Sequence, residues 1–247
     1  MPADDEKTAQ VILELLWRHT APAKPGTRGP KPALTVDTVV AAAIALADRD
    51  GIDKLTIRAV AAELGVRAMS LYTYIPSKEA LIVLMVDAVA TEDAPIPDDL
   101  PVRDRMIAIS AQIRAELLAH PWLLEVSPWR QVLGPGRMAR FERQLAAIDD
   151  IGLTDLAMDR AIAVLTDFAT GNARLAVAAA GAAAQQSDAD WWQVNGPLLA
   201  TLIPHDAFPL AGRVGTAAGE HHQAPADPHG AFDYGVTTLV NGILADL

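Results

Sequence analysis

Residues 64–78 read LGVRAMSLYTYIPSK and carry two tyrosines and two cations, Arg67 and Lys78, with little apolar material among them. The residues before them, 56–64, place apolar side chains at helical spacing and stop at Gly65. A second short helix is expected over Ala68–Tyr74, after a turn of about three residues. Two short helices around a glycine-containing turn form a helix-turn-helix, whose second helix lies in the major groove of DNA.

The composition of this second helix suits a recognition helix, because one of its faces must meet DNA instead of the protein core. Leu71 is expected to hold the helix to the core. The side chains left for base edges and phosphates are Arg67, Met69, Ser70, Tyr72 and Tyr74. Pairs of short helices around a glycine are also common in all-α proteins that bind no DNA, so geometry alone leaves both interpretations open.

Charge is distributed unevenly along the 247 residues, whose formal net charge is −11. Residues 20–80 hold eight cations and six anions, whereas residues 81–247 hold ten cations and twenty-one anions. An acidic total argues against generic nucleic-acid binding, but it leaves room for one relatively basic segment. Ordinary fluctuation in charge along a chain would also explain so small an excess.

The residue content narrows the class of protein. Cysteine is absent, which excludes disulfides, thiolate metal sites and cysteine nucleophiles. The N-terminus is acidic where a signal peptide would be basic, and no apolar stretch is long enough to span a bilayer. We therefore expect a cytoplasmic, soluble protein without a membrane partner.

Helical periodicity runs through the chain, and no stretch alternates in the manner of a strand, so the fold class is predicted to be all-α. Thr35, Thr56 and Ser77 are predicted N-caps. Residues 204–230 mix proline, glycine and histidine and are predicted to form a loop. The expected helices are Thr8–His19, 35–50, 56–64, Ala68–Tyr74, 77–89, Val102–His120, Trp122–Leu133, Arg137–Ile151, Asp155–Ala184 and a C-terminal helix carrying Val236–Leu247.

Residues 55–82, LTIRAVAAELGVRAMSLYTYIPSKEALI, resemble the helix-turn-helix signature of the tetracycline-repressor (TetR) family of bacterial transcription regulators. The preceding VVAAAIALADRDGIDKLT is similar to the first helix of that family. The resemblance implies three parts: an N-terminal helix and basic linker (1–34), a DNA-binding domain (35–80) and a ligand-binding and dimerisation domain (81–247). The DNA-contacting residues that it implies are Thr56, Arg58, Arg67, Ala68, Met69, Ser70, Tyr72, Tyr74 and Lys78.

The linker before the domain contains RGPKP, residues 28–32. Arg28 and Lys31 suit an arm that follows the minor groove or a run of phosphates. A solvated linker explains the same composition equally well.

The resemblance also implies a homodimer, a double-stranded DNA operator and a small-molecule inducer. The alanine-rich stretch Ala173–Ala184 and the apolar stripe Val236–Leu247 are candidates for the dimer contact, or else for the core of one chain. Aromatic side chains and one histidine of the body are candidates for the ligand site, although the interior of the fold needs such residues too. They are His120, Trp122, Trp129, Phe168, Trp191 and Trp192.

The sequence favours neither a metal site nor an enzyme. His205, His221, His222 and His229 lie in a proline- and glycine-rich stretch without the rigid spacing of a metal site, so we expect neither a metal nor a cofactor. No nucleotide-binding or hydrolase motif occurs, which argues against an enzyme. A DNA-binding architectural protein without an inducer remains the alternative to a ligand-responsive regulator, most often a repressor.

Overall fold

The computed structural model describes residues 2–20, 34–129, 132–204 and 206–245. Every regular element in these residues is helical, which confirms the all-α prediction. The elements are α1 (Pro2–Leu16), α2 (Val36–Asp50), η1 (Ile52–Lys54), α3 (Ile57–Glu63), α4 (Ala68–Leu71), α5 (Lys78–Val89), α6 (Val102–Ala119), η2 (Pro121–Glu125), α7 (Pro135–Ala146), η3 (Asp149–Ile151), α8 (Asp155–Ala183), α9 (Asp188–Leu202), α10 (Pro209–His222) and α11 (Pro228–Ala245).

The helix starts of the N-terminal region are fixed by side-chain caps at the predicted residues. The hydroxyl of Thr35 accepts from the backbone N–H of Thr38, that of Thr56 from Ala59, and that of Ser77 from Ala80. Each cap satisfies a backbone donor that has no partner inside its own helix. The chain therefore begins α2, α3 and α5 at defined residues.

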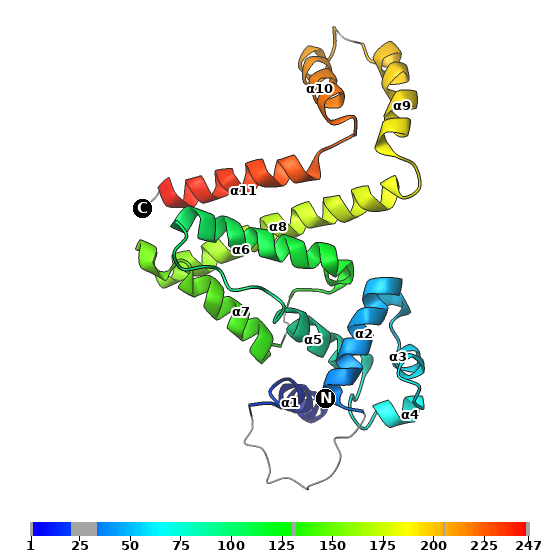
Figure 1. Ribbon diagram of the computed structural model, residues 1–247, viewed down its shortest axis with the longest axis vertical. Helices are drawn as coiled ribbons and strands as arrows, with labels where there is room; N and C mark the ends of the chain where they lie inside the picture. Colours follow the sequence, from blue (N-terminus) through cyan, green and yellow to red (C-terminus); the bar gives the residue numbers. More distant parts are fainter. Residues whose placement is uncertain (1, 21–33, 130–131, 205, 246–247) are drawn as a thin grey trace.

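The buried side chains form two apolar cores. The first joins α2, α3, α4 and α5, and it includes Leu16 at the end of α1 and Trp122 of η2. The second joins α6, α8 and α11, which lie against one another in Figure 1. Because the first core continues through Val89, α5 packs with the DNA-binding domain, beyond the boundary predicted at residue 80.

Helix α7 is fixed to α5 at a close crossing. The buried carboxylate of Asp87 on α5 accepts from the backbone N–H of Gly136 at 3.1 Å and of Arg137 at 2.9 Å, and so caps the start of α7. A Cβ on Gly136 would collide with the backbone carbonyl oxygen of Asp87. Glycine is therefore required here for the two backbones to approach.

The N-terminal helix α1 packs on α5 and is joined to the body by one side chain. The indole Nε1 of Trp17 donates to the carbonyl oxygen of Leu133, just before α7, at 3.2 Å. The Arg18 guanidinium pairs with Asp37 on α2. The helix starts six residues earlier than predicted, at Pro2 instead of Thr8.

Three predicted elements need correction. The helix expected over Trp122–Leu133 is a short 3-10 turn, η2, because Pro128 has no N–H for a helix interior. The helix expected over Arg137–Ile151 starts at Pro135 and ends at Ala146, and Gly152 has a left-handed backbone (φ 88°) soon after it. The recognition helix α4 covers Ala68–Leu71 and is shorter than expected.

The loop predicted over residues 204–230 was wrong, because it contains the helix α10. Proline is tolerated at the first helical position, which Pro209 occupies. The glycine at position 219 lies so close to the indole of Trp192 on α9 that a Cβ would collide with the ring. Gly219 is the buried residue of α10 within the described chain, and its approach to Trp192 joins α10 to α9. The two helices project together from the end of α8, away from the DNA-binding domain (Figure 1).

Candidate nucleic-acid interface and ligand cavity

The recognition helix is held by buried apolar residues on one side only. Val60 and Ala61 of α3 are buried with Leu71 of α4 and Ile75 just after it. Gly65 has φ 66°, a conformation that glycine adopts without strain, and it lets the chain turn between α3 and α4. The buried side of α4 is therefore Leu71, as predicted, and its other side chains are available to a partner.

The exposed surface of α3 and α4 carries cations without intramolecular partners. Within the described residues, the guanidinium groups of Arg58 and Arg67 make no hydrogen bond or ion pair. Met69 is 76% exposed and Tyr72 is 49% exposed, and Ser70 is exposed between them. An exposed cation beside polar and aromatic side chains suits contacts with phosphates, sugars and base edges.

The other predicted DNA-contacting residues have more constrained positions. The Thr56 hydroxyl is exposed and accepts from the backbone of α3. Ala68 and Tyr74 are half-buried and pack on the first core. The Lys78 ammonium group donates to the carbonyl oxygen of Ile52 at 3.3 Å, which ties α5 to η1. Arg28 and Lys31 lie outside the described residues.

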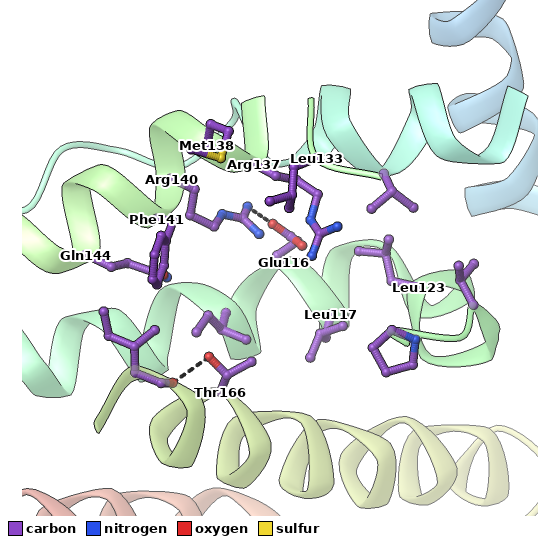
Figure 2. Close-up of a pocket in the computed structure, with 15 residues that line it drawn as sticks. Glu116, Leu117, Leu123, Leu133, Arg137, Met138, Arg140, Phe141, Gln144 and Thr166 are labelled. Atoms are coloured by element: carbon purple, nitrogen blue, oxygen red, sulfur yellow. Dashed lines mark hydrogen bonds and ion pairs between the residues drawn. The ribbon is translucent and has the colours of Figure 1, made fainter. Parts of the chain in front are cut away.

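A cavity of about 430 Å³ opens in the body, among α5, α6, α7 and α8 (Figure 2). This volume is in the range of small-molecule sites. Most of its lining is apolar, with five polar side chains among them. The lining residues are Val86, Ile113, Glu116, Leu117, Leu123, Val126, Pro128, Leu133, Arg137, Met138, Arg140, Phe141, Gln144, Ile162 and Thr166.

A buried network of charges lies at one wall of the cavity. The guanidinium of Arg140 donates from Nε to Asp93 Oδ2 at 2.6 Å and pairs with the carboxylate of Glu116 on α6 (Figure 2). All three side chains are at least four-fifths buried. Burial lowers the pKa of Arg140, and the attraction of Asp93 opposes that effect. Paired in this way, the guanidinium and its carboxylates hold α6 and α7 together.

A second polar cluster joins the body to the DNA-binding domain. The buried ring of His120, at the end of α6, lies 2.7 Å from Asp48 on α2 through Nδ1 and 3.2 Å from Glu92 through Nε2. The Trp122 indole donates to the same oxygen of Asp48 at 2.7 Å. Burial acts to lower the pKa of His120, but hydrogen bonds to Asp48 and Glu92 outweigh it, so the pKa is raised.

None of the six residues predicted to bind ligand lines the cavity of Figure 2. His120 and Trp122 form the cluster at the domain junction, and Trp129 is 79% exposed. Phe168 stacks on Phe232 of α11, with ring centroids 5.7 Å apart. Trp191 and Trp192 belong to α9. Ligand binding by the six residues therefore stays a prediction that this geometry does not favour.

The sequence prediction missed the polar residues of α7 that do line the cavity. Arg137, Arg140 and Gln144 recur at the three- and four-residue spacing of one helix face. Charged residues at this spacing are typical of a solvent-facing stripe, so the pattern gave no sign that the stripe faces inward. Phe141 lies on the same face of α7, and this apolar side chain is the sequence feature that indicates an inward-facing stripe.

The described histidines of the predicted loop, His221, His222 and His229, line one hollow with Asp227 but make separate contacts. His222 lies 3.7 Å from Asp227, whereas His229 contacts Arg114 at 3.1 Å. Within the described residues, no three His, Asp or Glu side chains form a group suited to a metal ion. His205 lies outside these residues. No helix in the described ranges is both long and apolar enough to cross a membrane.

Two family descriptions match the chain. "Bacterial regulatory proteins, tetR family" matches residues 39–85, and "Tetracyclin repressor-like, C-terminal domain" matches residues 95–247. The HTH-type transcriptional repressor DrrR1 of Streptomyces coeruleorubidus is 36% identical over 236 residues, which cover 94% of this chain and 84% of that protein.

Solved structures give the same likeness. Apo ActR from Streptomyces coelicolor has a TM-score of 0.70 and 28% identity, covering 87% of this chain and 96% of that one. ActR in complex with actinorhodin has a TM-score of 0.71 and 26% identity, covering 86% and 96%. The likeness therefore spans both the recognition helices and the body with its cavity.

Proposed function

The chain belongs to the tetR family of bacterial regulatory proteins, and on that premise we propose that it is a dimeric cytoplasmic repressor of a palindromic operator. A small molecule in the cavity of Figure 2 releases it from DNA. The observation that carries the proposal is the pair of exposed cations Arg58, on α3, and Arg67, at the start of α4, which form no ion pair with the described part of an acidic protein. Such cations supply the salt-dependent part of DNA affinity.

The position of the cavity supports release by a ligand. Two connections lead from it to the DNA-binding domain. Asp87 fixes the start of α7 to α5, which follows the recognition helix. Glu92 lies next to Asp93 of the cavity network and contacts His120, which contacts Asp48 on α2. A ligand that prefers one arrangement of α6 and α7 would thereby favour one position of the recognition helix.

Exposed apolar side chains on the α9–α10 pair support a dimer. They are Val194, Leu198, Leu202, Phe208, Leu210 and Val214. Exposed large apolar side chains on one helix pair suit a protein contact, and a second copy of the chain gives the two-fold symmetry that a palindrome requires. The predicted stripe Val236–Leu247 contributes Val236 and Val240 to the core of its own chain, so it is a weaker candidate.

Selection of the purified protein on random duplex DNA tests this function. We expect enrichment of a palindrome, and we expect the affinity of the selected duplex to fall steeply as salt rises. Light scattering should give the mass of a dimer, and Leu198→Glu with Leu210→Glu should give a monomer. If a folded dimer enriched no sequence at low salt, the regulatory function would be excluded.

An architectural protein without an inducer is the second candidate. Thermal denaturation with a library of small molecules separates the two, because a ligand that binds only the folded state raises the melting temperature. A compound that both raises the melting temperature and dissociates the selected duplex supports the repressor. A library with no such compound, against a protein that binds its palindrome, favours the architectural protein.

A further inference from the structure

The half-buried Arg137 side chain lines the cavity and forms no ion pair within the described residues. Arg137 lies in the first turn of α7, and its side chain extends toward α6 between Leu133 and Glu116 (Figure 2). The atom Nη1 is buried and has no hydrogen-bond partner within the described residues. Buried guanidinium groups are normally paired, because an unsatisfied donor loses its water without compensation.

The neighbouring carboxylates are already engaged by other groups. Both oxygens of Asp87 accept from the backbone N–H groups of Gly136 and Arg137 itself. The carboxylate of Glu116 pairs with Arg140. Burial lowers the pKa of Arg137, and the charge of Asp87 opposes that effect. Among the described residues, Arg140 is therefore paired with carboxylates, whereas no carboxylate forms an ion pair with Arg137.

The rest of the lining defines the body of the molecule that would fit. Leu117, Leu123, Leu133, Met138 and Phe141 are apolar and line the same cavity as the guanidinium. Thr166 donates its hydroxyl proton to the carbonyl oxygen of Ile162 at 2.7 Å, so it can only accept from a ligand. Besides the occupied Arg140, Arg137 and the Gln144 amide remain as donors.

We propose that Arg137 recognises a carboxylate on an otherwise apolar ligand that fills the cavity. The inference rests on the proposed function, since it names the chemical class of the ligand of the same site. A guanidinium forms two parallel hydrogen bonds with a carboxylate, which gives direction as well as attraction. Apolar side chains around the pair exclude water and strengthen it.

The experiment compares two probes of nearly equal shape, anthracene-2-carboxylate and its neutral methyl ester, by fluorescence titration of the full chain. We expect the carboxylate to bind at least about tenfold more tightly than the ester, because the ester cannot form the charged pair. Arg137→Gln should lose most of this preference, and Arg137→Lys should keep part of it. Arg160→Gln, which removes an exposed arginine on α8, should leave the preference unchanged.

Three outcomes would overturn the inference. They are equal binding of acid and ester to the parent protein, a preference that survives in a folded Arg137→Gln variant, and binding of neither probe. In the last case a water molecule, not a ligand carboxylate, satisfies Nη1. If Arg137→Gln fails to fold, the ratio of acid affinity to ester affinity in the parent protein and in Arg137→Lys still tests the inference. Selection of a palindrome is measured without either probe. If Arg137 shows no preference for the carboxylate, the proposed DNA binding therefore still stands. If no palindrome is selected, the preference for acid over ester can still be measured.

Discussion

The arginines at the recognition helices and those of the body have opposite surroundings. Arg58 and Arg67 are exposed and make no ion pair within the described residues, whereas Arg140 is largely buried between Asp93 and Glu116. The body also pairs Arg105 with Asp150, at 3.0 Å. The difference shows that net charge says little about DNA binding, because carboxylates of the body are paired with Arg105 and Arg140, whereas Arg58 and Arg67 keep their charge exposed on α3 and α4.

Removing the buried guanidinium should give the largest effect on stability. Arg140→Met leaves the largely buried Glu116 without its guanidinium and Asp93 with Arg143 alone, 4.0 Å away, and we expect a loss of about 3 kcal/mol of unfolding free energy at pH 7. Urea denaturation measures it. Arg160→Met, at an exposed position on α8, should change stability by less than about 0.5 kcal/mol. Equal losses in the two variants would contradict the contrast between buried and exposed arginines.

Removing an exposed side chain of the recognition helix should affect DNA and not stability. Arg67→Ala and Tyr72→Ala should each weaken binding of the selected duplex by about 1–3 kcal/mol, and Arg67→Ala should also relax base preference. Fluorescence anisotropy at two salt concentrations measures both effects. Arg213→Ala on the exposed face of α10 serves as the control. Parent-like DNA affinity in both recognition-helix variants would show that this surface is not the interface.

Removing an uncharged N-cap of α3 should lower stability without changing the salt dependence of DNA binding. Thr56→Ala removes the acceptor for the Ala59 N–H, and we expect about 1 kcal/mol of lost stability. The DNA salt slope should stay that of the parent, because no cation is removed. A changed salt dependence of DNA binding in a fully folded variant would mean that Thr56 helps to position the cations on α3.

The smallest effect should be a change of stability with pH that arises from His120 at the domain junction. Because Asp48 and Glu92 raise the pKa of folded His120, its contribution to stability is complete below the unfolded pKa of about 6.5. That contribution is lost as pH rises through the higher folded value. His120→Gln should therefore cost more stability at pH 6 than at pH 8, in urea titrations of parent and variant. A difference that is constant with pH would exclude a charged His120.

Sequence predicted the recognition region better than the body, for physical reasons. Caps, the turn glycine and the buried Leu71 are local features, and the structure has them at the predicted residues. The cavity depends on which face of α7 turns inward, and a stripe with Arg137, Arg140 and Gln144 suggests the opposite face. Likewise, the approach of Gly219 on α10 to the Trp192 ring on α9 is a contact that no local pattern reveals.

The hydrogen bond from Trp17 to Leu133 has a practical consequence for truncated versions of this protein. Leu133 lines the cavity, and Leu16 beside that tryptophan belongs to the first core. A protein shortened to begin at residue 34 would therefore lose more than a DNA-facing extension. It would also lose the hydrogen bond that holds Leu133, a residue that lines the cavity. Ligand affinities measured on such a fragment would describe a looser site than that of the whole chain.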